Sequence, residues 1–195
     1  MLSSQENERL TRVGPGTPGG ELLRRYWHPV AIAQELTEEK PTKFVRILCE
    51  DLVLFRDKKG RVGLIEDRCA HRGASLVYGR VEERGIACAY HGWLYDTDGN
   101  CLETPPEPVE SKFRLTIKQK AYPVQNFAGL YWTYMGPQPV PALPKYDLLV
   151  RRDGKTHHGS PSVGLQLVCC SRKRRGSISP PGSPSGHAQE NGKTH

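Results

Sequence analysis

Two short stretches of this sequence determine how the rest is interpreted: Cys69-Ala-His71-Arg-Gly-Ala74 and Cys88-Ala-Tyr-His91-Gly-Trp93. Each stretch provides one thiol and one imidazole, followed closely by a glycine. Sulfur and imidazole nitrogen are ligands for zinc and for iron–sulfur clusters, and glycine lets the backbone approach a bound group closely. The pattern therefore predicts one metal centre, with the ligands Cys69, His71, Cys88 and His91.

Two kinds of metal centre use two cysteines and two histidines. Structural zinc sites hold all four on one ion, and they usually pair like with like, as Cys-x-x-Cys and His-x-x-x-His. In a Rieske [2Fe–2S] cluster, two cysteines bind one iron and two histidines bind the other. Each stretch here mixes the two ligand types at the expected end of a β-hairpin. This arrangement favours the iron–sulfur cluster, and zinc is the alternative.

The surrounding sequence predicts a mainly β fold made of small antiparallel sheets. Short helices are expected over residues 3–10 and 21–26, and loops around them. Runs of branched and aromatic residues separated by turn signals predict strands at 44–48, 52–55, 61–65, 86–89, 93–95, 121–126 and 130–135. The turns between them are clearest at 57–60 and 96–100, where aspartate and glycine occur together.

Four segments follow from this pattern. Residues 1–41 form an N-terminal helix-and-loop segment, and 42–136 form the cluster domain. Residues 137–165 are a proline-rich linker with the remnant of a further domain's start, and 166–195 are expected to be a disordered basic tail. No run of about 18 apolar residues and no secretory signal occur, so we expect a soluble cytoplasmic protein without a membrane span.

The charge of the chain is unevenly distributed. The formal net charge is +7, yet residues 1–150 hold 20 Lys and Arg against 19 Asp and Glu. The excess therefore belongs to the tail and not to the β domain. A basic tail is compatible with nucleic acid, but we expect no nucleic-acid partner, because the tail is explained better in another way below.

The two Cys/His stretches resemble those of the Rieske non-haem iron aromatic-ring-hydroxylating oxygenases. Residues 1–150 resemble oxygenase subunits of the phthalate dioxygenase type, through the segments Leu10–Thr17, Gly20–Trp27 and Glu50–Asp57. The resemblance implies a [2Fe–2S] cluster, a reductase as electron donor, a homo-oligomer in the intact family and a mononuclear Fe(II) that hydroxylates an aromatic substrate. Respiratory Rieske proteins carry an extra cysteine in each loop, where this chain has Ala74 and Tyr90. This difference favours the low end of the Rieske potential range, roughly −150 mV.

The motif for the mononuclear iron is missing from this sequence. The family holds that iron with two histidines and a carboxylate, in Asp-x-x-His-x-x-x-x-His. If the reading frame is shifted by one nucleotide near Gln166, the sequence that follows is compatible with that motif. We therefore expect an oxygenase subunit shortened by a frameshift. Such a chain would have no catalytic residues and would not oxygenate a substrate alone. The alternatives are a naturally disordered basic tail and, for the function, a stand-alone Rieske ferredoxin-like electron carrier.

Overall fold

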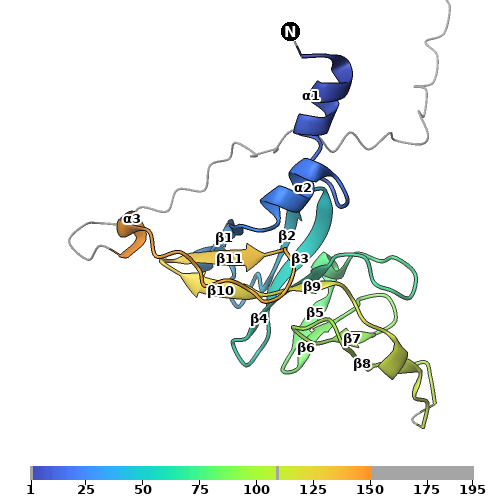
Figure 1. Cartoon of the computed structure of the whole chain (residues 1–195). Helices are drawn as coiled ribbons and strands as arrows, with labels where there is room; N and C mark the ends of the chain where they lie inside the picture. The colour runs from blue at the N-terminus through green and yellow to red at the C-terminus, as the bar shows by residue number, and fades with distance from the viewer. Residues whose placement is uncertain (1, 109, 151–195) are drawn as a thin grey trace, which may run out of the picture.

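The structure of the chain is a computed structural model, in which residues 2–108 and 110–150 are described (Figure 1). Its α-helices are α1 (Ser4–Thr11), α2 (Pro18–Leu23) and α3 (Asp147–Val150). Single 3-10 turns are η1 (Ala33–Glu35), η2 (Leu76–Tyr78) and η3 (Phe113–Thr116). The strands are β1 (Trp27–Ile32), β2 (Thr42–Ile47), β3 (Glu50–Arg56), β4 (Val62–Glu66), β5 (Arg80–Glu82), β6 (Gly85–Ala87), β7 (Leu94–Tyr95), β8 (Cys101–Glu103), β9 (Ala121–Tyr122), β10 (Val124–Phe127) and β11 (Leu130–Tyr134).

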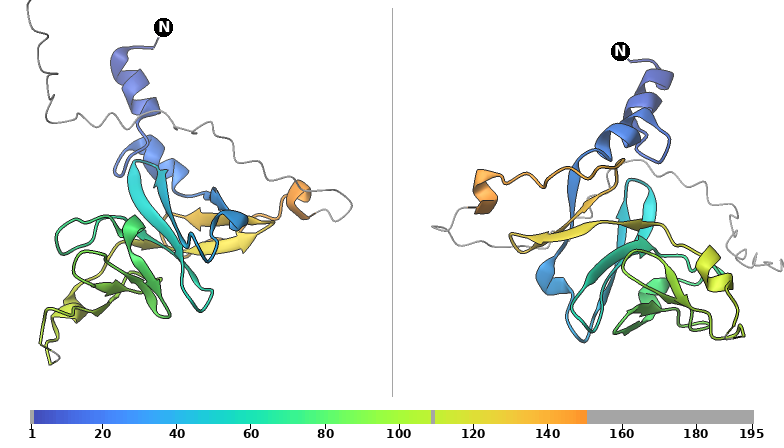
Figure 2. Two further views of the ribbon diagram at one scale, coloured as in Figure 1. Left: turned by 180° about the vertical axis from the view of Figure 1, so that it is seen from behind. Right: turned by 60° about the horizontal axis from the view of Figure 1, so that its bottom comes forward.

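The strands form three small antiparallel sheets. Their orders are β1-β11-β10, β2-β3-β4-β9 and β5-β6-β7-β8. Helices α1 and α2 lie at one end of the molecule and the β5–β8 sheet lies at the opposite end, as Figures 1 and 2 show. The expected mainly β fold of small antiparallel sheets is therefore confirmed within the described residues.

Strand β3 lies between two hydrophobic cores. Four consecutive side chains, Leu52, Val53, Leu54 and Phe55, are fully buried. Because successive residues of a strand point to opposite faces, Val53 and Phe55 join the core of the β5–β8 end, and Leu52 and Leu54 join the core beneath the helices. The sheet that carries β3 thus provides a rigid base for the loops of the β5–β8 end.

Strand β1 lies inside the segment expected to contain only helix and loop. It pairs with β11 at the edge of its sheet, and its register shifts between Pro29 and Ala31. Proline lacks the N–H that a central strand requires, so Pro29 suggested a break in the sequence. An edge strand with a bulge tolerates it, which is why local sequence alone missed β1.

Three other expectations needed adjustment. Helix α1 is capped by Ser3 rather than Ser4, through a reciprocal pair of bonds with Glu6. Helix α2 begins at Pro18, earlier than expected, because the Thr17 hydroxyl accepts the Gly20 N–H and proline suits the first helical turn. The strand expected over 121–126 is two strands in different sheets, β9 and β10, which are separated by Pro123.

A group of charges centred on the largely buried Glu50 fastens α2 to the sheets. The Glu50 carboxylate lies 2.5 Å from Arg24 Nη1 and 2.6 Å from Lys120 Nζ, and it accepts a hydrogen bond from the Tyr122 hydroxyl at 2.7 Å. Arg24 also donates to the Leu48 carbonyl. Burial acts to raise the pKa of Glu50, but its donors and neighbouring cations outweigh burial and hold that pKa below the ordinary value.

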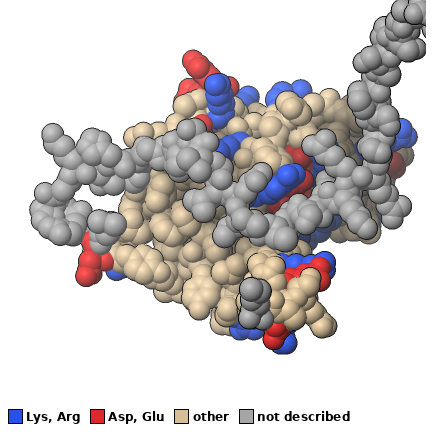
Figure 3. Space-filling model, turned by 90° about the horizontal axis from the view of Figure 1, so that it is seen from above, with Lys and Arg blue, Asp and Glu red and all other residues tan. Residues whose placement is uncertain are grey.

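The surface of the described residues mixes both signs of charge. On the face drawn in Figure 3, basic and acidic side chains adjoin one another, in keeping with the ion pairs of Arg46 with Asp51 and of Lys43 with Glu35. No helix within residues 2–108 and 110–150 has the length and apolar character needed to cross a membrane. The expected basic tail and the frameshift near Gln166 lie outside the described residues.

Candidate metal centre

The first Cys/His loop, Cys69–Ala74, follows β4. The Cys69 N–H donates to the Ala74 carbonyl at 2.9 Å, and the Cys69 carbonyl accepts from the Gly73 N–H at 2.8 Å. Gly73 has φ +70°, a left-handed conformation that costs a residue with a Cβ roughly 1–2 kcal/mol. The loop therefore closes on itself tightly around the side chains of Cys69 and His71.

The second Cys/His loop, Cys88–Trp93, joins β6 to β7 and repeats the same hydrogen bonds. The Cys88 N–H donates to the Trp93 carbonyl at 2.8 Å, and the Cys88 carbonyl accepts from the Gly92 N–H at 2.9 Å. Gly92 has φ +73°, and a Cβ there would lie 3.3 Å from the Pro105 ring. The two loops thus have equivalent backbones, although the histidine is two residues after the cysteine in one and three residues after it in the other.

The two loops bring both predicted histidines together. The ring centroids of His71 and His91 lie 4.6 Å apart, with the rings edge to face. The Trp93 indole stacks on His71 at 4.7 Å, and the Tyr90 ring lies against His91 at 3.9 Å. Trp93 is buried and Tyr90 is exposed, so His71 is sheltered by the core while His91 lies beside the surface.

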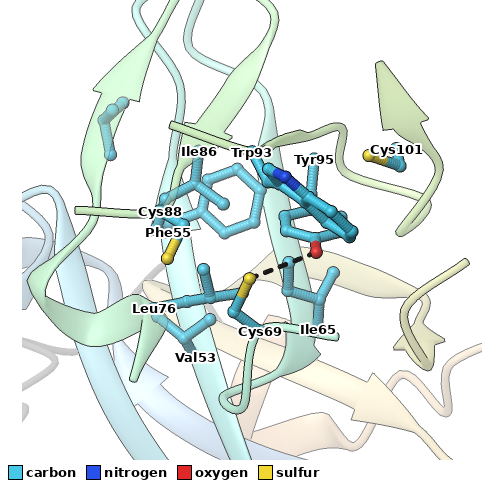
Figure 4. Close-up of a cluster of buried hydrophobic side chains, with 11 residues drawn as sticks. Val53, Phe55, Ile65, Cys69, Leu76, Ile86, Cys88, Trp93, Tyr95 and Cys101 are labelled. Carbon is cyan, nitrogen blue, oxygen red and sulfur yellow. Dashed lines mark hydrogen bonds between the residues drawn. The ribbon is translucent and has the colours of Figure 1, made fainter. Parts of the chain in front are cut away.

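Both predicted cysteines are free thiols buried at the edge of one hydrophobic cluster, which Figure 4 shows. The hydroxyl of Tyr95 points at the sulfur of Cys69, with 3.3 Å between the two atoms. Burial raises the pKa of the Cys69 thiol, and the nearby Cys88 adds to the rise. Two adjacent buried thiolates are costly unless a cation offsets their charge, which is the condition that a metal centre satisfies.

One nitrogen of His91 lacks a partner. Its Nδ1 is buried and has no hydrogen bond within the described part of the chain. Desolvation, the neighbouring His71 and the charge of Arg72 lower the pKa of His91, which favours the neutral imidazole. A neutral imidazole with a free buried nitrogen is the form that binds a metal. The residues present therefore fit a metal centre bound by imidazole nitrogen and cysteine sulfur.

Zinc and a [2Fe–2S] cluster differ in how their protein ligands are grouped. Within residues 2–108 and 110–150, no three His, Cys, Asp or Glu side chains gather as one metal ion would require. A tetrahedral zinc ion needs four ligands around one point. A [2Fe–2S] cluster takes only two protein ligands per iron, so its ligands form two separate pairs. The two loops present two thiols and two imidazoles, and the preference for the cluster over zinc rests on the way each loop mixes the two ligand types.

A buried carboxylate, which the sequence did not single out, secures the first loop. Asp67 is 1% exposed, and its Oδ1 accepts from the Ser75 hydroxyl at 2.7 Å and from the Val77 N–H at 3.2 Å. These bonds tie the residues before the loop to those after it.

The third buried cysteine, Cys101, lies on the far side of Tyr95 from the Cys69 sulfur in Figure 4, and burial raises its pKa to about 11. Cys101 therefore belongs to the core and not to the ligand set.

Two matching Cys/His loops at the end of a small antiparallel β domain define an iron–sulfur protein of the Rieske class. In agreement, residues 26–125 match the family model described as the Rieske [2Fe-2S] domain, and the chain belongs to this family. A Rieske domain implies a [2Fe–2S] cluster.

Several of the similar proteins are oxygenase subunits. The chain is 54% identical over 142 residues to the phenoxybenzoate dioxygenase subunit alpha of Ectopseudomonas oleovorans. The aligned region covers 72% of this chain and 34% of the relative. It is 44% identical over 147 residues to the phthalate 4,5-dioxygenase oxygenase subunit of Pseudomonas putida, with coverages of 75% and 33%. The chain thus spans about a third of the length of the curated relatives it matches.

Solved structures show the same relationship. The oxygenase–ferredoxin complex of carbazole 1,9a-dioxygenase matches with a TM-score of 0.54 and 33% identity, over 62% of this chain and 31% of that one. The resemblance to Rieske oxygenases of the phthalate dioxygenase type, seen in the sequence, is therefore confirmed.

Proposed function

We propose that this chain binds one [2Fe–2S] cluster, with Cys69 and Cys88 on one iron and His71 and His91 on the other. The observation that carries the proposal is the pair of equivalent loops, each of which contributes one buried thiol and one imidazole. Such a cluster supplies reversible one-electron transfer.

The chain's own residues adapt the site to that chemistry. A metal-bound cysteine has no proton, so the Tyr95 hydroxyl must donate its hydrogen bond to the Cys69 sulfur. The buried Trp93 excludes water from one face of His71. The Tyr90–His91 pair leaves one imidazole beside the surface, where an electron-transfer partner has the shortest path.

We infer further that the chain serves as the Rieske part of an aromatic-ring-hydroxylating oxygenase, which accepts electrons from a reductase or a ferredoxin. The similarity to phthalate and phenoxybenzoate dioxygenase subunits and to an oxygenase crystallised with its ferredoxin supports this assignment. The mononuclear Fe(II) implied by the family has no candidate ligand group within residues 2–108 and 110–150. The two Cys/His loops support the electron-transfer half of the reaction.

Metal and sulfide analysis tests the cluster assignment. We expect iron and acid-labile sulfide each to approach two per chain, and a reductive titration to accept one electron. The variants Cys88→Ser and His91→Ala should lose the cluster's visible spectrum, whereas Cys101→Ser, a matched change at a buried free cysteine outside the loops, should retain it. Stoichiometric zinc without sulfide would refute the proposal.

A further inference from the structure

A buried glutamine far from both loops in the sequence reaches the first of them. Gln119 lies just before β9 and is 3% exposed. Its Nε2 donates a hydrogen bond of 2.6 Å to the carbonyl of Arg68, the residue immediately before Cys69. This hydrogen bond joins residues that are 51 positions apart and contacts the neighbour of a predicted ligand. Packing alone does not explain such a contact.

That hydrogen bond holds one end of a particular peptide unit. The Arg68 carbonyl and the Cys69 N–H belong to the same planar peptide group, so fixing both fixes the plane. Gln119 holds the carbonyl, and the Ala74 carbonyl holds the N–H at 2.9 Å. The Cα of Cys69 lies at the corner of this plane, and its sulfur is only two bonds further along the side chain.

Gln119 is itself firmly anchored. Its backbone N–H donates to the Gly99 carbonyl at 2.7 Å, and the carbonyl of the next residue, Lys120, accepts from the Glu66 N–H at 2.8 Å. A Cβ at Gly99 would lie 2.2 Å from the Gln119 carbonyl oxygen, so the turn and the glutamine fit without spare space. The Gln119 side chain therefore fixes the first Cys/His loop relative to the β2-β3-β4-β9 sheet.

We propose that Gln119 is a positioning residue that fixes the Arg68–Cys69 peptide and thereby holds the Cys69 sulfur against the Tyr95 hydroxyl. This inference rests on the cluster assignment made above. Without the amide donor, only the N–H end of the peptide is still held, so the peptide plane can tilt and the 3.3 Å contact between Cys69 and Tyr95 lengthens. Because hydrogen bonds to a ligand sulfur favour the reduced cluster, the midpoint potential should then fall.

The variant Gln119→Met keeps the length of the side chain and removes its donor, and Gln125→Met makes the same change at an exposed position of β10. We expect Gln119→Met to have a lower midpoint potential than the wild type, and to release iron to a chelator roughly fivefold to tenfold faster, as the loss of one buried hydrogen bond implies. Gln125→Met should match the wild type in both measurements. Should Gln119→Met fail to fold, Gln119→Leu, which is uncharged and also lacks the amide donor, replaces it.

A double-mutant cycle separates positioning from general stability. If Gln119 acts through the Tyr95–Cys69 contact, Gln119→Met should not lower the potential further in a Tyr95→Phe background. A wild-type potential in Gln119→Met, or a shift that persists undiminished in that background, would overturn the inference. Failure of both Gln119 variants to fold would also count against it, as evidence of a general packing role. A wild-type protein without sulfide would instead refute the cluster assignment.

Discussion

Replacing Tyr95 by phenylalanine removes a single hydroxyl from a fully buried ring. The ring itself stays in the hydrophobic cluster that it shares with Trp93 and Phe55. Only the hydrogen bond to the Cys69 sulfur, across 3.3 Å, is lost. Burial, and then the neighbouring Cys69, raise the pKa of Tyr95, which favours the protonated hydroxyl that donates this bond.

The size of the effect follows from the charge on the sulfur. A hydrogen bond to a charged acceptor contributes about 1.5–3 kcal/mol. The reduced cluster carries one more negative charge, and we assign about 1 kcal/mol of that energy to the difference between the two oxidation states. For a one-electron couple about 59 mV corresponds to about 1.4 kcal/mol, so the midpoint potential of Tyr95→Phe should fall by about 40 mV.

A redox titration followed by electron paramagnetic resonance measures this shift directly. Tyr134→Phe is the matched control, because the Tyr134 hydroxyl is also part of a buried side chain and donates to the Pro137 carbonyl at 3.2 Å, in a different hydrophobic cluster. The control should lose about 1 kcal/mol of unfolding free energy and keep its potential. An unchanged potential in Tyr95→Phe, or an equal shift in both variants, would refute the reasoning.

Three further predictions concern the loops and the buried charges. Gly73→Ala should lower the free energy of unfolding, measured in urea, by roughly 1–2 kcal/mol, because its positive φ disfavours a residue with a Cβ. Gly92→Ala should lower it by more, because a Cβ at position 92 also meets a proline ring, whereas position 73 is open. Equal losses in the two variants would contradict this. The folded-state pKa of Glu50 lies below its ordinary value of 4.5, so its contribution to stability is complete above that value and is lost as the pH falls through the folded pKa. Glu50→Gln should therefore flatten the dependence of unfolding free energy on pH between about pH 5 and 3, and an unaltered slope would count against the network. Trp93→Leu uncovers one face of His71, and the visible absorption of the cluster should bleach several-fold faster in air; wild-type bleaching would show that the ring gives no shelter.

Much of the fold could be predicted because its signals are local. Strands β2, β3 and β4 are hydrophobic runs separated by turn residues, and the turn at Asp57 closes through its own backbone, with the Gly60 N–H donating to the Asp57 carbonyl at 2.9 Å. The short strands β5 and β8 were missed, because three residues carry little pattern of their own. Strand β1 and the division of β9 from β10 were missed as well. For β1 and for the β9–β10 division, a proline was ambiguous until the neighbouring strands were known, since its missing N–H matters only where a partner strand lies on that side.

The sequence by itself determined the family and proposed four ligands, because the ligands are provided by two short loops whose spacing is a property of the chain. That assignment stays a prediction until iron and sulfide are measured. Only the tertiary structure brought His71 within 4.6 Å of His91 and placed Tyr95 and Gln119 against the first loop. Tyr95 lies 26 positions from Cys69, and Gln119 lies 51 positions from Arg68. No local pattern of tyrosine or glutamine indicates such contacts, because they arise when the β5–β8 sheet and the segment just before β9 close over the loop. A hydrogen bond depends on that final distance and not on the order of residues along the chain.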